Sequence, residues 1–215
     1  KNSPKDASLL QLLGTLYLQK ENFEKAKEYL EKSYKINSKN SNTLNNLGNL
    51  EKKLKNYKKA SEYFQINIDK NNFLSSWINK SNIFIEEEQF EEGLIFIEKA
   101  ISKFPNDVKL RNNYAIFLFN TGKVNECFRI YKDFNNKKLH FSESLLNYSK
   151  ILFQVKEYEK SLNTVNILLN LNKQDHKGLV QRFLIYRDIN KFDKAEADIL
   201  SAYNINKSDF LTNKM

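Results

Sequence analysis

Apolar and polar residues follow one another along this chain with the period of an α-helix. In the first stretch, apolar or small residues recur three, four and seven positions apart: Leu10, Leu13, Gly14 and Tyr17. This spacing places them on one face of a helix. A polar turn at residues 20–22 separates this stretch from a second one with the same period. Residues 7–40 are therefore predicted to form two helices joined by a tight turn.

The same pattern of two helices recurs six times. Its most regular landmark is an apolar residue that opens the second helix: Phe23, Tyr57, Phe90, Val124, Tyr158 and Phe192. These landmarks lie 34, 33, 34, 34 and 34 positions apart. The repeats are predicted at 7–40, 41–73, 74–107, 108–141, 142–175 and 176–209. Because a period of this length is typical of stacked helical hairpins, we expect one all-α solenoid over residues 7–209.

The residue types within each period resemble the tetratricopeptide repeat. That family's signature is W-x2-L-G-x2-Y in the first helix, then A-x3-F, then a proline. The residues that carry the resemblance include Gly14, Ala26, Leu47, Gly48, Ala60, Phe64, Trp77 and Pro105. The resemblance implies a right-handed superhelix whose first helices line a concave groove. It leaves residues 1–6 as a lead-in and 210–215 as the start of a further repeat or a linker, and we expect a longer native protein.

Some positions depart from the family pattern. Glu51 stands where an aromatic residue is usual, and Arg111 and Arg182 stand at positions that are usually apolar. The fourth repeat also ends loosely over residues 133–138, which we interpret as the weakest joint of the array. The small residues Gly14 and Gly48 lower helix propensity, so we expect them to allow close approach of two helices.

The composition of the chain gives little information about the chemical class of its partner. Lys and Arg number 35 against 26 Asp and Glu, which gives a net charge of +9. This charge could favour an acidic partner or a nucleic acid, but Lys and Asn also share A/T-rich codons with the abundant Ile, Phe and Tyr. Since no long basic block occurs, we do not expect nucleic-acid binding. No apolar run approaches the ~18 residues of a membrane span, and without a signal peptide we expect a cytoplasmic protein.

The residues most often used in catalysis or metal binding are sparse. The single Cys127 stands where other repeats have a small residue, and His140 and His176 lie near repeat boundaries. No phosphate-binding loop or zinc-binding motif is present. The acidic cluster of residues 86–92 is interpreted as a solvated helix end, with a cation site or a contact for a basic partner as alternatives. We therefore expect neither a cofactor nor enzymatic activity within this chain.

The strongest candidate for a binding site is the sixth residue of each repeat. From the first repeat to the last it is Leu12, Asn46, Asn79, Asn113, Asn147 and Gln181, with Asn49 and Asn82 as further amides nearby. An amide offers two donors and one acceptor, so a row of them can bond both N–H and C=O groups of an extended peptide. The row resembles the asparagine ladder of O-GlcNAc transferases. The alternative is that Asn is simply the common residue of the family at this position.

Further candidates for the groove combine cations with apolar side chains. Lys109, Lys150 and Phe153 are predicted to line it, together with Ile116, Phe119, Lys177, Leu184 and Arg187. Apolar anchors between cations suit a peptide with hydrophobic and acidic residues. The alternative is that some of these apolar side chains pack adjacent repeats.

Two functions follow from this sequence. The first is an adaptor that binds extended segments of partner proteins in the groove. The second is the substrate-recruiting arm of a larger transferase similar to O-GlcNAc transferase, with its catalytic domain outside this chain. The lysine, asparagine and arginine set with which some relatives bind chaperone tails does not occur in any register, so we do not expect that mode of binding.

Overall fold

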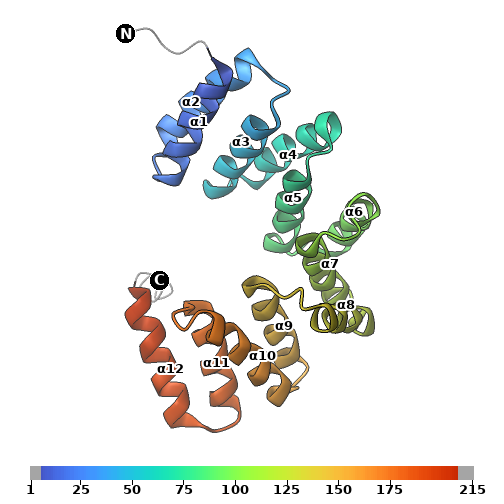
Figure 1. The fold of residues 1–215 in the computed structure, drawn as a ribbon, viewed down its shortest axis with the longest axis vertical. Coiled ribbons are helices and arrows are strands. Elements are labelled where there is room, and N and C mark those ends of the chain that lie inside the picture. The colour runs from blue at the N-terminus through green and yellow to red at the C-terminus, as the bar shows by residue number, and fades with distance from the viewer. Residues whose placement is uncertain (1–5, 208–215) are drawn as a thin grey trace. The chain divides into compact units, whose positions relative to one another are not determined.

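A computed structural model describes residues 6–207, and these residues fold into twelve α-helices with no strand (Figure 1). The predicted all-α solenoid class is therefore confirmed. The helices are α1 (Ala7–Gln19), α2 (Phe23–Ile36), α3 (Ser41–Lys53), α4 (Tyr57–Asn71), α5 (Leu74–Glu86), α6 (Phe90–Lys103), α7 (Val108–Asn120), α8 (Val124–Lys137), α9 (Ser142–Gln154), α10 (Tyr158–Leu171), α11 (His176–Asp188) and α12 (Phe192–Ile205). The predicted lead-in, apart from Asp6, and the predicted continuation at 210–215 lie outside the described residues.

The odd-numbered helices are the first helices of the hairpins. Each has 13 residues and begins at the first residue of a predicted repeat. Several begin after an Asp or Asn whose side chain accepts hydrogen bonds from the first turn, as Asp6, Asn40, Asp107 and Asp175 do. Such caps satisfy backbone N–H groups that have no partner within the helix. Every residue can therefore be given a register number, counted from the start of its first helix.

The turn inside each hairpin has the same backbone geometry. One residue adopts a left-handed conformation with φ between 55° and 81°: Glu21, Lys55, Glu88, Gly122, Lys156 and Asn190. The N–H of the next residue then donates to the carbonyl five positions earlier, as from Asn22 to Tyr17 at 2.9 Å. This arrangement closes the first helix and reverses the chain direction. Gly122 adopts this conformation without strain, and Asn190 is of a type that tolerates it, whereas the other four residues are Glu or Lys.

Small residues allow the two helices of a hairpin to approach closely. A Cβ atom added at Gly48 would lie 2.4 Å from Cε1 of Phe64, and one added at Gly14 would lie 2.5 Å from Cγ of Leu30. Both distances are too short for any real side chain. The expected reason for Gly14 and Gly48 is therefore confirmed.

Two of the charged departures from the family pattern are bonded inside the fold. Glu51 is 2% exposed and accepts hydrogen bonds from Asn56 at 2.8 Å and from Lys59 at 2.8 Å. Arg182 makes a two-pronged ion pair with Asp198, with both N–O distances at 2.7 Å. A buried charge is tolerated when it is paired and hydrogen-bonded, which explains how polar residues occupy these positions.

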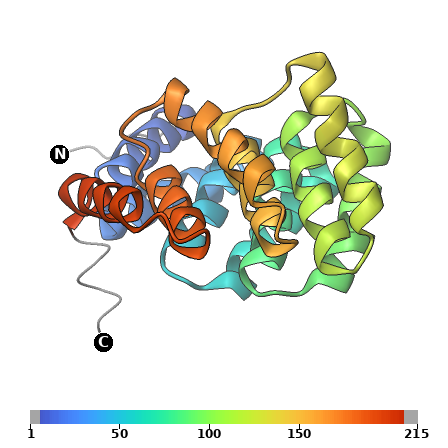
Figure 2. The same ribbon diagram turned by 90° about the horizontal axis from the view of Figure 1, so that it is seen from below.

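The chain divides into two compact units between Lys123 and Val124. The first unit contains α1 to α7 and the second contains α8 to α12. Within each unit, helices that follow one another along the chain lie side by side (Figure 2). The boundary falls inside the predicted repeat 108–141.

The segment predicted to be the weakest joint is mostly helical and is anchored by the buried Phe134. Helix α8 continues to Lys137, so most of residues 133–138 is helical. The following His140 contacts Asn135 at 2.7 Å and lies against the rings of Phe134 and Tyr148. Burial among these groups lowers the pKa of His140. The aromatic side chains stabilise this connection, an effect that the loop-like sequence did not suggest.

Candidate peptide-binding surface

The first helices of successive hairpins are neighbours within each unit. Helix α3 contacts both α1 and α5, α5 contacts α7, and in the second unit α9 contacts α11. These helices carry the sixth-position residues that were predicted to bind peptide. The bonds that these side chains make therefore decide which of them can reach a ligand.

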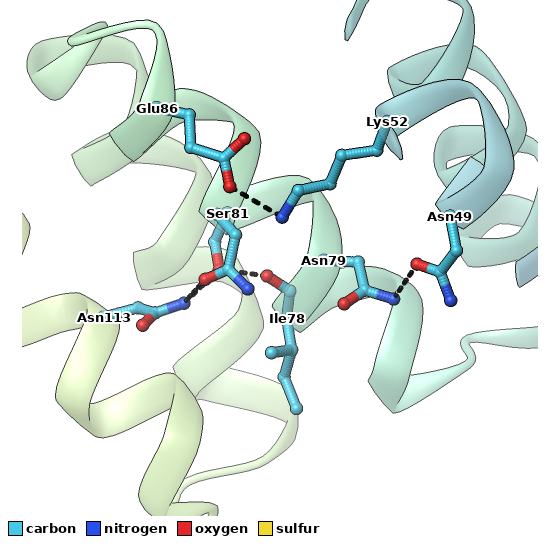
Figure 3. A network of polar contacts seen from close by, with 8 residues as sticks. Asn49, Lys52, Ile78, Asn79, Ser81, Glu86 and Asn113 are labelled. Carbon is cyan, nitrogen blue, oxygen red and sulfur yellow. Dashed lines mark hydrogen bonds and ion pairs between the residues drawn. The ribbon is translucent and has the colours of Figure 1, made fainter. Parts of the chain in front are cut away.

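In the first unit the sixth-position asparagines donate to the preceding first helix. Asn46 Nδ2 donates to Thr15 Oγ1 at 2.7 Å. Asn79 Nδ2 donates to Asn49 Oδ1 at 2.9 Å (Figure 3). Asn113 Nδ2 donates to Asn82 Oδ1 at 2.6 Å.

Additional partners make these contacts stronger. Asn79 also donates to Asn45 at 3.1 Å, and Asn113 donates to Ser81 at 2.8 Å. Asn113 is 3% exposed. The amide nitrogens of this row are therefore engaged within the protein, and the predicted binding residues Asn49 and Asn82 are their acceptors.

These bonds obey a simple register rule. In all three cases the sixth residue of one repeat donates to the ninth residue of the repeat before it. The ninth residues involved are Thr15, Asn49 and Asn82. Each of them has an oxygen that can accept a hydrogen bond. We call this bond the inter-repeat tie.

The tie is missing at Gln181 in the second unit. Gln181 is 3% exposed, and its Nε2 atom has no hydrogen-bond partner among residues 6–207. The ninth residue of the preceding repeat is Lys150, whose ammonium group can donate hydrogen bonds but cannot accept them. A donor therefore occupies the register position that supplies the acceptor in the first unit.

Asn147 also lacks the tie. Its side chain is half-buried and makes no hydrogen bond with residues in the described part of the chain. The ninth residue of the repeat before it is Ile116, which has no hydrogen-bonding group in its side chain. The two amides of the second unit thus remain available for a ligand.

Both amides line one cavity between α9 and α11. Its volume is about 680 Å³. Its other lining residues include the cations Lys150 and Lys177 and the apolar side chains Leu146, Val180 and Leu184. Small-molecule and peptide sites commonly combine an apolar wall with a few polar groups in this way.

The electrostatics of the cavity are set by four charged groups. Desolvation lowers the pKa of Lys150, and the nearby Lys177 cation lowers it further. Glu143 and Asp175 also line the cavity, and Asp175 accepts a hydrogen bond from the Gly178 N–H at 2.8 Å. A carboxylate ligand would relieve the repulsion between the two lysines.

Comparison with known proteins agrees with the repeat geometry. The family model of the tetratricopeptide repeat matches residues 7–40, 41–65 and 74–107. These three segments are tetratricopeptide repeats. A TPR repeat-containing protein of Methanocaldococcus jannaschii is 34% identical over 87 residues, a match that covers 38% of this chain and 27% of the length of that relative.

Solved structures support the same fold. PilF of Pseudomonas aeruginosa superposes with a TM-score of 0.71 at 16% identity, over 97% of each chain. A tetratricopeptide repeat protein of Parabacteroides merdae gives a TM-score of 0.84 at 15% identity, over 98% of this chain and 83% of that one. Tetratricopeptide repeats generally mediate protein–protein interactions, and proteins built from them are typically non-enzymatic scaffolds.

Two other residues that the repeat pattern suggested for the groove, Phe153 and Lys109, do not line this cavity. Phe153 packs against the buried cluster around Val165 and contacts Tyr158 edge-on, with the ring centroids 5.7 Å apart. Lys109 is exposed on α7 in the first unit. The structure thus brings Asn147, Lys150 and Gln181 together in one cavity, whereas Phe153 is partly buried against the cluster around Val165.

The other residues considered for catalysis or metal binding are buried or make contacts within the fold. Cys127 is buried in α8, and burial raises the pKa of its thiol to about 12. Glu86 of the acidic cluster forms an ion pair with Lys52 at 2.8 Å (Figure 3). Among residues 6–207, no group of three or more acidic, His or Cys side chains is arranged to hold a metal ion. Nor is any helix of this range both long and apolar enough to cross a membrane.

Proposed function

We propose that this protein is an adaptor that binds an extended, acidic peptide segment of a partner protein, and that the cavity between α9 and α11 holds that segment. The observation that carries the proposal is the buried Gln181 amide nitrogen without a partner. It belongs to a cavity that also contains Lys150 and Lys177. All three side chains can donate hydrogen bonds, and the described residues supply no acceptor for Gln181.

The energetics favour an oxygen ligand at this place. A buried donor without a partner costs about 1–3 kcal/mol. A peptide carbonyl or carboxylate oxygen would remove this cost, and a carboxylate would also interact with the two lysines. The apolar side chains Leu146, Val180 and Leu184 would contact apolar side chains of the same peptide. An extended peptide with alternating acidic and apolar residues fits both requirements.

The transferase-arm alternative depends on a continuous row of open amides. In the first unit, however, the nitrogens of Asn46, Asn79 and Asn113 are engaged in inter-repeat ties. A local site in the second unit fits an adaptor that recognises a short segment, so we favour the adaptor.

The first test measures binding of a fluorescein-labelled decapeptide of alternating Leu and Glu by fluorescence anisotropy. Replacing both Lys150 and Lys177 with Ala is expected to raise its Kd by about tenfold or more, because each cation contributes on the order of 1 kcal/mol. The matched control replaces Lys132 and Lys191 with Ala, which removes the same charge from exposed positions outside the cavity. Equal affinities for the two double variants would exclude the cavity as the site. A decapeptide of alternating Leu and Lys should not bind.

A second variant tests the contribution of the Gln181 amide separately from that of the two lysine charges. Gln181→Met keeps the size of the side chain and removes the unpaired donor. We expect the free energy of unfolding to rise by about 1 kcal/mol while affinity for the Leu–Glu peptide falls about fivefold. Urea unfolding followed by circular dichroism measures the first effect, and Gln154→Met at the exposed end of α9 is the control. If Gln181→Met destabilised the fold instead, the amide would be bonded internally and the proposal would fail.

A further inference from the structure

Helix α9 begins without the side-chain cap that most first helices of this chain have. The residue before it is Phe141, whose ring cannot accept a hydrogen bond from the first turn. As a result, the backbone N–H groups of Ser142, Glu143 and Ser144 have no acceptor among residues 6–207. These donors lie at the positive end of the helix dipole and are left for another partner.

The open start of α9 lies at the cavity between α9 and α11. Ser142 and Glu143 line this cavity together with Lys150, Lys177 and Gln181. The Gln181 side chain is 3% exposed, and its amide nitrogen has no partner within the described part of the chain. A buried side-chain donor and an uncapped helix start thus border the same space. Both are satisfied by one acceptor group that enters the cavity.

The two lysines define the charge of that acceptor group. Neither Lys150 nor Lys177 makes an ion pair with a residue of the described range 6–207. Of the two carboxylates at the cavity, Asp175 already accepts the cap hydrogen bond from the Gly178 N–H, and Glu143 is exposed. Two unpaired cations are neutralised by two negative charges, whereas a single carboxylate group supplies only one.

A phosphorylated side chain meets these requirements better than a carboxylate does. A phosphoserine carries a charge of about −1.5 to −2 at neutral pH and has three strong acceptor oxygens. A carboxylate has one charge and two oxygens. One phosphoryl group therefore has enough oxygen atoms to accept from the two lysines, from Gln181 and from the N–H groups of α9.

We infer that the partner segment is phosphorylated and that its phosphoryl group binds at the start of α9, with Lys150, Lys177 and Gln181 as side-chain donors. The apolar wall of the cavity would then contact the residues beside the phosphorylated one. The inference rests on the proposed peptide-binding function and adds a condition to it. The cavity binds its partner tightly only after that partner has been phosphorylated.

Three fluorescein-labelled decapeptides test the inference on the unmodified 215-residue chain. All three alternate leucine with glutamate, and one central acidic position is glutamate in the first, phosphoserine in the second and unmodified serine in the third. Fluorescence anisotropy should give a Kd for the phosphoserine peptide about tenfold below that of the glutamate peptide, with the serine peptide weakest. If inorganic phosphate competes as strongly as unlabelled phosphoserine peptide, the inference is overturned in favour of a site for the free anion.

A proline at the start of α9 tests the backbone donors. Ser142→Pro removes the N–H and hydroxyl groups of the first helical residue, a position that suits proline and that follows the extended backbone of Phe141. The preference for phosphoserine over glutamate should fall from about tenfold to about twofold. Ser41→Pro makes the same change at the start of α3, outside the cavity, and should keep the full preference. Circular dichroism checks that both variants are folded.

The outcomes separate this inference from the proposed function. Equal affinities for the phosphoserine and glutamate peptides would overturn the inference and leave the acidic-peptide site in place. No binding of any of the three peptides would overturn both. A full preference for phosphoserine in folded Ser142→Pro would also overturn the inference, because the phosphoryl group would then bind elsewhere. The peptide comparison uses the unmodified protein, so it decides the question even if Ser142→Pro does not fold.

Discussion

Replacing Asp198 with alanine is expected to destabilise the second unit by about 3 kcal/mol. The carboxylate of Asp198 is the two-pronged partner of Arg182, and its hydrogen bonds raise the pKa of that guanidinium. Asp198 is 5% exposed. Its loss would leave Arg182 with only the hydrogen bond to Asn166 at 2.9 Å in partly buried surroundings. The cost arises because a desolvated cation without its counter-charge is far less stable than the pair.

Two measurements locate this effect. Circular dichroism in urea follows both units, while fluorescence of Trp77, the single tryptophan, follows the first unit alone. We expect Asp198→Ala to lower the urea midpoint measured by circular dichroism. The urea midpoint measured by Trp77 fluorescence should stay nearly unchanged. Glu196→Ala, an exposed carboxylate on the same helix, is the control and should change stability by less than about 0.5 kcal/mol. Equal effects of the two substitutions would show that the ion pair contributes nothing measurable.

Replacing Gly48 with leucine is expected to destabilise the first unit by about 1–3 kcal/mol. Even a single added Cβ would meet the ring of Phe64 at 2.4 Å, and Phe64 is 0% exposed. The ring cannot move aside without displacing other core side chains. The helices α3 and α4 must therefore separate, which weakens their packing along its whole length.

This effect should appear in the Trp77 fluorescence midpoint. Asn42→Leu, at an exposed position of the same helix, is the control for adding a leucine. A second comparison combines Gly48→Leu with Phe64→Ala. The double variant should be more stable than the sum of the two single effects predicts, with a coupling of about 0.5–3 kcal/mol. A purely additive result would show that the two residues do not meet as described.

The repeat period was sufficient to predict the class of fold. Landmarks such as Phe23 and Tyr57 recur because each second helix must bury the same face against its neighbours, and this requirement is visible in the sequence. The small residues at Gly14 and Gly48 could be interpreted for the same reason. Charged residues such as Arg182 could not, because their partners lie in another helix and are not related to them by the period.

The candidate site shows a similar limit. The sixth-position amides all looked equivalent in the sequence. The repeat pattern compares the same register position in each repeat and does not show which residue of a neighbouring repeat lies opposite. Whether an amide is available depends on the ninth residue of a different repeat, which is Asn49 for Asn79 but Lys150 for Gln181. A comparison of these two positions across neighbouring repeats would have separated the first-unit amides from Gln181. The packing of Phe153 against the Val165 cluster could not be predicted, because an apolar residue suits both a core and a ligand site.

The inter-repeat tie also bears on how such an array can change in length. Each tie in the first unit joins the same two register positions, so the second and third hairpins each carry a donor for the repeat before them and an acceptor for the repeat after them. Duplication or deletion of one whole hairpin by unequal recombination would therefore regenerate a matched pair at the new junction. Insertion beside Lys150 would not, because the added repeat would meet a donor. The first unit can thus grow by copying its second or third hairpin, while an insertion between α9 and α11 would alter the cavity that these two helices line.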